Sequence, residues 1–235
     1  MKSLTVYLGR SPATARVLPF VVFVLLTACQ GLFGEAGRYW FYVAKTVLGG
    51  VLVCAMVPIV SELRVNLSLA AVLVGFAVFG IWIGTENSWT TQPGLWAKLG
   101  LTTPSPAPPK LWNPHLYFGQ DSVLAWIVIL TRIFGSTIVV PPLEEVFYRS
   151  FLYRYLSKTD FLTVPLGRLV PGPFVLTALL FGFTHREWLA GILCGMAYQG
   201  LVIWKNRLGD AIAAHAITNL LLGLWVVLRG QWQFW

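Results

Sequence analysis

The chain has 235 residues, of which 57% are hydrophobic and only 11% are charged, and its mean hydropathy is +0.70. Because a soluble domain carries about 25% charged residues, this composition excludes an ordinary soluble globular protein. The net charge of +8 does not indicate nucleic acid as a partner, since the lysines and arginines lie mostly in short loops and at helix ends, where membrane proteins normally carry them. We therefore expect membrane lipid around the chain.

Apolar stretches close to the roughly 17 to 25 residues of a spanning helix recur along the chain. We predict spans at residues 17–33, 39–60, 67–84, 122–140, 143–157, 173–185, 188–204 and 210–228. Backbone groups in lipid need partners within their own segment, so these stretches form helices rather than isolated strands. The predicted fold class is an all-α integral membrane protein, a bundle of about eight transmembrane helices in one structural domain.

The first apolar run follows basic residues, as in a signal peptide, but another span follows at once, so we expect a retained first helix. The cysteines Cys29, Cys54 and Cys194 all lie inside apolar runs. This placement favours packing roles over a disulfide or a cysteine-based metal site.

One polar interruption, residues 85–121, divides the chain into an N-terminal three-helix membrane region, 1–121, and a five-helix core, 122–235. The closely spaced prolines of its centre, "TTPSPAPPK" at 102–110, disfavour helix. The aromatic residues that flank this centre suit a segment at the headgroup level. They are Trp89, Trp96, Trp112 and Tyr117.

The apolar stretch 188–204 contains Gly191 and Gly195 at GxxxG spacing, with Gln199 one turn further on. Small residues four apart let two helix backbones approach closely in lipid. We predict a central, tightly packed helix and a structural role for Gln199.

Ionisable residues inside spans cost several kcal/mol each, so each one is a functional-site hypothesis. Polar residues of this kind gather in the second half of the chain. They are Glu144, Glu145, Arg149, His185, His215 and Asn219.

The first group lies in "PPLEEVFYR", where Pro141 and Pro142 suit the start of a helix. Glu145 and Arg149 are four residues apart with the acid first, the favourable order for an ion pair. Such a pair alone would account for both residues. Glu144 points about 100° away on the same helix and has no cation three or four residues on, which makes it a candidate general base.

The other groups are "FGFTH", with Phe181 and His185 one turn apart, and "HAITN", with His215 and Asn219 on one side of the last helix. A histidine at a helix C-terminus is often only a favourable dipole contact. His215 and Asn219 lie at lipid depth with no charged residue beside them, so they need partners from another helix.

Together the blocks EExxxR at 144–149, FxxxH at 181–185 and HxxxN at 215–219 resemble the motifs of the CPBP family. This is the CAAX prenyl protease and bacteriocin-processing group of intramembrane endopeptidases, and the resemblance covers roughly residues 122–230. The chain end, "TNLLLGLWVVLRGQWQFW", further resembles a bacterial subgroup of CAAX prenyl protease-related proteins associated with exosortase-type sorting systems.

The resemblance implies that Glu144 and His185 activate a water molecule, and that His215 and Asn219 stabilise the oxyanion. It gives Glu145, Arg149 and Phe181 a supporting role and implies no metal or other cofactor. Peptide hydrolysis needs these parts, and each oxyanion donor is often worth about 2.7 to 4 kcal/mol. Charged groups at depth require a water-accessible polar cavity within the bundle.

The expected substrate is a membrane-tethered protein or C-terminal peptide, and components of a protein-sorting system are possible partners. The expected location is the inner membrane of a bacterium. Two alternatives stay open. Glu144, His185 and His215 would also suit a catalytic zinc site with water as the fourth ligand, and a non-catalytic scaffold or immunity protein would use the polar cluster only to join helices.

Overall fold

The computed structural model describes residues 2–86, 89–102 and 111–235, and over these residues the chain is helical without any strand. The proline-rich centre predicted at 102–110 lies outside the described residues, apart from Thr102. The chain forms two compact units. Both units draw residues from either side of position 121, and the division of the chain at that position stays a prediction.

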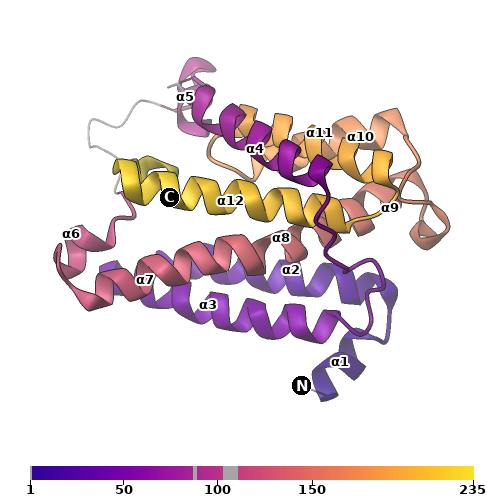
Figure 1. Ribbon diagram of the computed structural model, residues 1–235, viewed down its shortest axis with the longest axis horizontal. Helices are drawn as coiled ribbons and strands as arrows, with labels where there is room; N and C mark the ends of the chain where they lie inside the picture. Colours follow the sequence, from indigo (N-terminus) through magenta and orange to yellow (C-terminus); the bar gives the residue numbers. More distant parts are fainter. Residues whose placement is uncertain (1, 87–88, 103–110) are drawn as a thin grey trace. The chain divides into compact units, whose positions relative to one another are not determined.

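The first unit comprises Met1–Arg64, Leu111–Phe147 and Asn219–Trp235. Its helices are α1 (Lys2–Leu8), α2 (Pro12–Cys29), α3 (Gly34–Met56), α6 (Pro114–Phe118), α7 (Val123–Phe134), η1 (Gly135–Val139), α8 (Val140–Glu145), the last part of α12 (Gly209–Arg229) and η4 (Trp232–Phe234). Figure 1 shows α2, α3 and α7 side by side in this unit.

Small side chains allow the helices of the first unit to pack closely. A Cβ atom on Gly135 of η1 would lie 2.6 Å from the Thr46 hydroxyl on α3, and one on Gly49 would lie 2.7 Å from Val139. Gly135 therefore packs against Thr46, and Val139 packs against Gly49. Because the residue numbers rise together in the two pairs, α3 and the α7–η1 segment run in the same direction.

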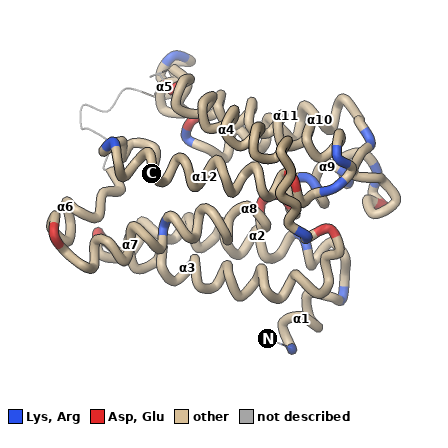
Figure 2. Tube along the Cα trace, viewed as in Figure 1, with Lys and Arg blue, Asp and Glu red and all other residues tan. Residues whose placement is uncertain are grey.

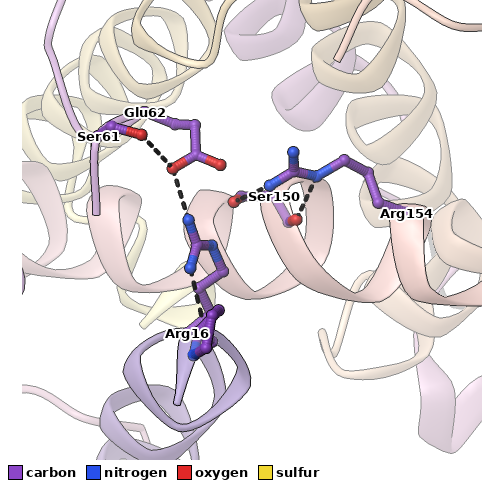
Figure 3. Close-up of polar contacts among 6 residues, drawn as sticks. Arg16, Ser61, Glu62, Ser150 and Arg154 are labelled. Atoms are coloured by element: carbon purple, nitrogen blue, oxygen red, sulfur yellow. Dashed lines mark hydrogen bonds and ion pairs between the residues drawn. The ribbon is translucent and has the colours of Figure 1, made fainter. Parts of the chain in front are cut away.

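The start of α2 shows how the sequence sets a helix end. The Ser11 hydroxyl accepts hydrogen bonds from the backbone N–H groups of Ala13 and Thr14, and Pro12 occupies the first turn, where its missing N–H costs nothing. Arg16, on the next turn, pairs with Glu62 at 2.6 Å, and Figure 3 shows the guanidinium pointing to that carboxylate. This buried ion pair ties α2 to the turn after α3.

The helix that carries Glu144 differs from the prediction. The spans predicted at 122–140 and 143–157 are one continuous helix, Val123–Ser157, built from α7, η1, α8, η2 (Val146–Leu152) and α9 (Tyr153–Ser157). Pro141 and Pro142 were expected to begin a new helix, but they follow the π-helical turn η1 instead. A π turn holds one more residue than an α turn. This wider turn accommodates the rings of Pro141 and Pro142, which would clash with the backbone inside a regular α-helix.

The second unit comprises Val65–Lys110 and Tyr148–Thr218. It holds α4 (Leu69–Gly84), α5 (Gln92–Lys98), most of η2, α9, η3 (Phe161–Thr163), α10 (Pro171–Phe183), α11 (Trp188–Lys205) and the first part of α12. In α9, the Arg154 side chain turns back and donates a hydrogen bond of 2.8 Å to the Ser150 hydroxyl (Figure 3).

The GxxxG prediction for α11 is confirmed. A Cβ atom on Gly191 would lie 2.8 Å from the Cα of Gly182, and one on Gly195 would lie 3.1 Å from the Cα of Ala178. The backbones of α10 and α11 therefore touch, and Gln199 is buried one turn beyond this contact.

Helix α4 comes from the first half of the chain but packs in the second unit. A Cβ atom on Gly75 would lie 2.9 Å from the Ala214 carbonyl oxygen, and the Thr218 hydroxyl lies 2.9 Å from the Gly75 carbonyl oxygen. At the start of α4, Ser68 donates a hydrogen bond to Asp210. The first half of α4 is thus joined to the first part of α12.

Four helices of the described residues are long and apolar enough to cross a membrane: Pro12–Cys29, Gly34–Met56, Val123–Ser157 and Gly209–Arg229. Leu69–Gly84 and Pro171–Phe183 are apolar but shorter. Figure 2 shows that the charged residues lie mostly at helix ends and in connections. These features fit an integral membrane protein. The described residues hold four such helices rather than about eight spans, because two predicted spans merge, α4 and α10 are shorter, and α11 is not among the four.

Candidate active site

The imidazole of His185 is fixed by the backbone of α10. His185 lies in the turn after the last helical residue, Phe183, rather than at the end of the helix as predicted. Its Nδ1 is 2.7 Å from the Phe181 carbonyl oxygen. A carbonyl oxygen only accepts hydrogen bonds, so Nδ1 carries the proton, and in the neutral ring Nε2 is the basic nitrogen. The motif spacing FxxxH thereby sets the tautomer of its own histidine.

Two hydroxyl groups support this arrangement. The Thr184 hydroxyl donates to the same Phe181 carbonyl oxygen at 2.7 Å. The Tyr148 hydroxyl is 3.3 Å from the Thr184 oxygen, and with the Thr184 hydrogen already engaged, Tyr148 is the donor. Helix segment η2 is thus linked to the turn that carries His185.

Three polar side chains of the second unit contact the Phe181 ring. It is tilted against the His185 ring with centroids 4.6 Å apart and lies edge to face with His215 at 6.2 Å. The Arg149 guanidinium lies over the Phe181 ring at 4.3 Å, and one of its nitrogens is 3.5 Å from the Gly195 carbonyl oxygen. A cation over an aromatic face is stabilised by the ring quadrupole, so Phe181 stabilises the fully buried Arg149 and also contacts both histidines.

His215 is oriented by a tyrosine. The Tyr198 ring stacks on the His215 ring with centroids 5.1 Å apart, and the Tyr198 hydroxyl donates to Thr218 at 2.8 Å. Both tyrosine and histidine are buried. The hydrogen bond to α12 and the stacking contact together fix the plane of the imidazole.

Trp82 of α4 also contacts His185. Its ring meets the imidazole edge to face with centroids 5.5 Å apart, and it is 8% exposed. Its indole nitrogen is buried and has no hydrogen-bond partner among the described residues. Sequence analysis missed Trp82, Tyr148 and Tyr198, because a tryptophan or tyrosine in an apolar helix has the ordinary signature of a core residue.

The remaining predicted site residues belong to the first unit. Glu145 is fully buried in α8, and Glu144 beside it is partly buried. Asn219, on α12, donates its side-chain N–H to the Ser136 carbonyl oxygen at 2.8 Å. The predicted residues therefore fall in two sets: Arg149, Phe181, His185 and His215 gather in the second unit, and Glu144, Glu145 and Asn219 lie in the first.

The turn that carries His185 is held by Trp89 and by the first residue of α5, Gln92. The Gln92 backbone N–H donates to the Arg186 carbonyl oxygen at 2.7 Å, and the Trp188 indole donates to the Trp89 carbonyl oxygen at 3.3 Å. Glu187, next in this turn, is 7% exposed. Burial raises the pKa of the Glu187 carboxyl, the Glu86 carboxylate adds to the rise, and its own backbone N–H and Arg186 oppose it.

No group of three or more His, Cys, Asp or Glu side chains within the described ranges is arranged to hold a metal ion. Of the cysteines expected to pack in the apolar helices, Cys194 is buried and Cys29 is half-buried, whereas Cys54 is exposed.

Comparison with known proteins gives one family match. Residues 125–221 match the model for the type II CAAX prenyl endopeptidase Rce1-like family. This range contains every predicted site residue from Glu144 to Asn219. No curated protein and no solved structure matches the chain significantly. The match supports the resemblance to the CPBP family and, with the apolar helices, an integral membrane peptidase of the CAAX type.

Proposed function

We propose that this protein is an intramembrane glutamic endopeptidase that hydrolyses a peptide bond in a membrane-tethered protein, near the C-terminus of that protein. The observation that carries the proposal is the fixed tautomer of His185, whose Nδ1 proton goes to the Phe181 carbonyl oxygen. The same Phe181 ring contacts His185, His215 and the buried Arg149, and a histidine with a basic Nε2 is suited to proton transfer. The family match over 125–221 favours a peptide as the substrate.

The roles follow the motifs residue by residue. Glu144 takes a proton from water with the help of His185, and the water oxygen attacks the carbonyl carbon of the peptide bond. His215 and Asn219 donate hydrogen bonds to the oxyanion that forms. The C–N bond then breaks, and the leaving nitrogen receives the proton held by Glu144.

Glu145, Arg149 and Phe181 support the site rather than react. Arg149 and Glu145 are both fully buried, and a buried charge requires an opposite charge or polar partners. Asn219 suits a donor role because a side-chain amide has two N–H groups, and Ser136 engages one of them.

We place the protein in the inner membrane of a bacterium, with a C-terminal sorting segment as substrate and components of a sorting system as partners. The resemblance of the chain end to the exosortase-associated subgroup supports this choice. This assignment does not require a lipid anchor on the substrate.

The test is membrane co-expression of the protein with tagged candidate C-terminal segments, followed by mass spectrometry of the tagged product. We expect a new terminus with the wild type, its loss with Glu144→Gln, and its retention with Glu86→Gln, which changes an exposed carboxylate in the same way. Addition of a strong chelator leaves cleavage unchanged if the water is activated without zinc.

Three results contradict the proposal. Normal cleavage by a folded Glu144→Gln variant removes Glu144 as the base. Loss of cleavage in chelator, restored by zinc, replaces the glutamic mechanism by a zinc mechanism. Absence of cleavage across all segments encoded with the sorting system favours a scaffold in which the polar cluster only joins helices.

A further inference from the structure

The two ends of the hairpin formed by α10 and α11 differ in positive charge. Gly191 lies against Gly182, and one turn further along Gly195 lies against Ala178. Because the residue numbers change in opposite directions, the two helices are antiparallel, and the start of α10 and the end of α11 share one end of the second unit. We call this the basic end, and Figure 2 shows several blue segments beside α9 there. Among the described residues, its connections and the adjoining helix turns hold Arg154, Lys158, Arg168, Lys205 and Arg207.

The other end of the hairpin holds the His185 turn, and fewer basic residues lie there. Within the described part of the second unit these are Lys98, at the end of α5, and Arg186, in the turn itself. The orientation of a membrane protein follows the number of lysines and arginines in its short connections, whereas acidic residues contribute little. The difference between the two ends is therefore the quantity that orients this unit.

The basic end and the His185 turn lie about one membrane thickness apart. Helix α11 has 18 residues and rises about 27 Å at 1.5 Å per residue, close to the roughly 30 Å of a hydrocarbon core. Helix α4 gives a second measure, because Ser68 at its start donates a hydrogen bond to Asp210 at the basic end. Trp82, near the other end of α4, contacts His185. These two contacts are about 21 Å apart along the helix.

Aromatic residues indicate that the His185 turn lies near a membrane surface. Trp89 and Trp96, beside and within α5, are 41% and 37% exposed. Tryptophan concentrates at the boundary between lipid chains and headgroups, and the Lys98 ammonium, 5.7 Å from the Trp89 ring centroid, suits the same depth. Because the Gln92 N–H of α5 bonds to the turn that carries His185, this turn lies close to the boundary as well.

Helices α2 and α3, taken by themselves, have the same kind of asymmetry. The ion pair between Arg16 and Glu62 joins the start of α2 to the turn after α3, so these positions share one end. Arg10 and Arg64 lie in the chain segments beside this pair. The connection between the other ends of the two helices has no lysine or arginine before Arg38. A single basic end is thus a property of two separate helix pairs.

We propose that the basic end of the second unit lies at the cytoplasmic surface of the membrane, and that the His185 turn lies toward the opposite surface. Short connections rich in lysine and arginine stay on the cytoplasmic side when a membrane protein inserts. The anionic lipids of the cytoplasmic leaflet then attract the same side chains. This orientation follows from charge and helix direction and does not depend on a catalytic role for any residue.

The consequence for the substrate rests on the proposed peptidase function. A histidine that lies toward the outer surface acts on a peptide that reaches it from the side opposite the cytoplasm. The peptide segment must therefore cross the membrane before it is cut. The step that supplies the substrate is thus protein export.

The test of the orientation is labelling of single cysteines with a maleimide that does not cross membranes. The background is the full chain with Cys29→Ala and Cys54→Ala, and Cys194 stays because it is buried. Thr159→Cys places a thiol at the basic end, and Glu86→Cys places one at the end of α4. Both positions are exposed, and neither change removes a lysine or arginine. We expect Glu86→Cys to be labelled in spheroplasts and Thr159→Cys to be labelled only in inverted membrane vesicles.

Two controls accompany the labelling. The background variant itself should remain unlabelled on both sides, which shows that Cys194 does not react. Thermal unfolding in detergent shows that each cysteine variant is folded. For the substrate, one candidate C-terminal segment is expressed in two forms, exported by a signal peptide or retained in the cytoplasm, and we expect cleavage of the exported form alone.

The outcomes separate the orientation from the peptidase function. The reverse labelling pattern, or labelling of both positions from both sides, overturns the orientation whatever the cleavage assay gives. The expected labelling without cleavage of either form supports the orientation and counts against the peptidase function. Cleavage of the cytoplasmic form alone overturns the side from which the substrate is taken.

Discussion

The side-chain amide of Asn219 donates a hydrogen bond to the Ser136 carbonyl oxygen, and the N···O distance is 2.8 Å. That carbonyl lies in the π turn η1, in which the Val140 N–H donates its hydrogen bond to the Gly135 carbonyl oxygen. Its next candidate donor along the helix, residue 141, is a proline and has no N–H. Asn219 therefore replaces a backbone hydrogen bond that Pro141 cannot make.

This relationship predicts a coupling between Asn219 and Pro141. Asn219→Ala leaves a part-buried carbonyl without this hydrogen bond and should lower the free energy of unfolding by about 1 kcal/mol. Pro141→Ala returns an N–H to the helix, so the same Asn219→Ala change should cost less in that background. Thermal unfolding in detergent of the two single variants and the double variant measures the coupling.

The cleavage assay separates this structural role from the proposed catalytic one. If Asn219 also donates to the oxyanion, the double variant recovers stability but not activity. Full recovery of cleavage in the double variant would limit Asn219 to its structural role. Additive stability changes would instead show that Pro141 and Asn219 do not act on one carbonyl.

The contact between Trp82 and His185 predicts a positioning effect. Trp82→Ala removes the ring that packs against the His185 imidazole. A displacement of about 1 Å at a reacting group can lower the rate about a hundredfold. We expect cleavage to fall by about tenfold to a hundredfold, with a shifted pH profile. Trp82→Phe retains an aromatic wall and should restore most of the activity.

Trp40→Ala is the control for loss of a tryptophan side chain, since Trp40 is 45% exposed on α3. Equal losses in Trp82→Ala and Trp40→Ala would point to general destabilisation. An unchanged pH profile in Trp82→Ala, with His185 still required, would argue against a positioning role.

The close contact of α10 and α11 predicts opposite effects for two glycines of one helix. Gly191→Ala places a methyl group 2.8 Å from the Cα of Gly182, so the helices must separate, at a cost of about 1 to 3 kcal/mol. Gly200→Ala meets nothing within 4 Å and should stabilise the helix by about 0.5 to 1 kcal/mol. Midpoints of thermal unfolding in detergent give both signs, and a stabilising Gly191→Ala would contradict the contact.

The buried Glu187 predicts a dependence of stability on pH. Because burial raises its pKa in the folded protein, the folded state binds more protons than the unfolded state from about pH 4.5, the usual value, up to the raised pKa. The contribution is fully present below that window and is lost as the pH rises through it. The Glu187→Gln side chain cannot ionise. The free energy of unfolding of this variant should therefore increase relative to that of the wild type as the pH rises from 4 to 8.

Unfolding midpoints measured across that range, with Glu35→Gln as the control for an exposed carboxylate, test the prediction. Glu35 is 46% exposed. Parallel curves for the wild type and Glu187→Gln would show that the Glu187 pKa is the same in the folded and unfolded states.

Several features of the fold could be predicted from the sequence because they depend on local properties. Hydropathy over about twenty residues identifies α2, α3 and α12, and the spacing of Gly191 and Gly195 predicts the tight helix contact that the structure contains. The merging of two predicted spans at Pro141 was missed. Sequence rules treat paired prolines as a helix start, whereas a π turn before them lets one helix continue.

The residues that carry the site chemistry were likewise found from the sequence, because polar side chains in apolar helices are costly and therefore conspicuous. Glu144, His185, His215 and Asn219 were named on that basis and by resemblance, and their catalytic roles stay predictions. What the sequence did not show is how the histidines are held. Trp82 and Tyr198 act through contacts with residues about 100 and 17 positions away, and their side chains look like ordinary core aromatics.

The sequence by itself determined that this is a helical membrane protein with an EExxxR, FxxxH and HxxxN set, since composition and residue spacing are properties of the chain alone. Only the tertiary structure decided that α4 packs with the helices of the second half, that Asn219 bonds to Ser136, and that Trp82 contacts His185. Each of these depends on contacts between distant segments. Such contacts arise from the packing of whole helices, and no local pattern records them.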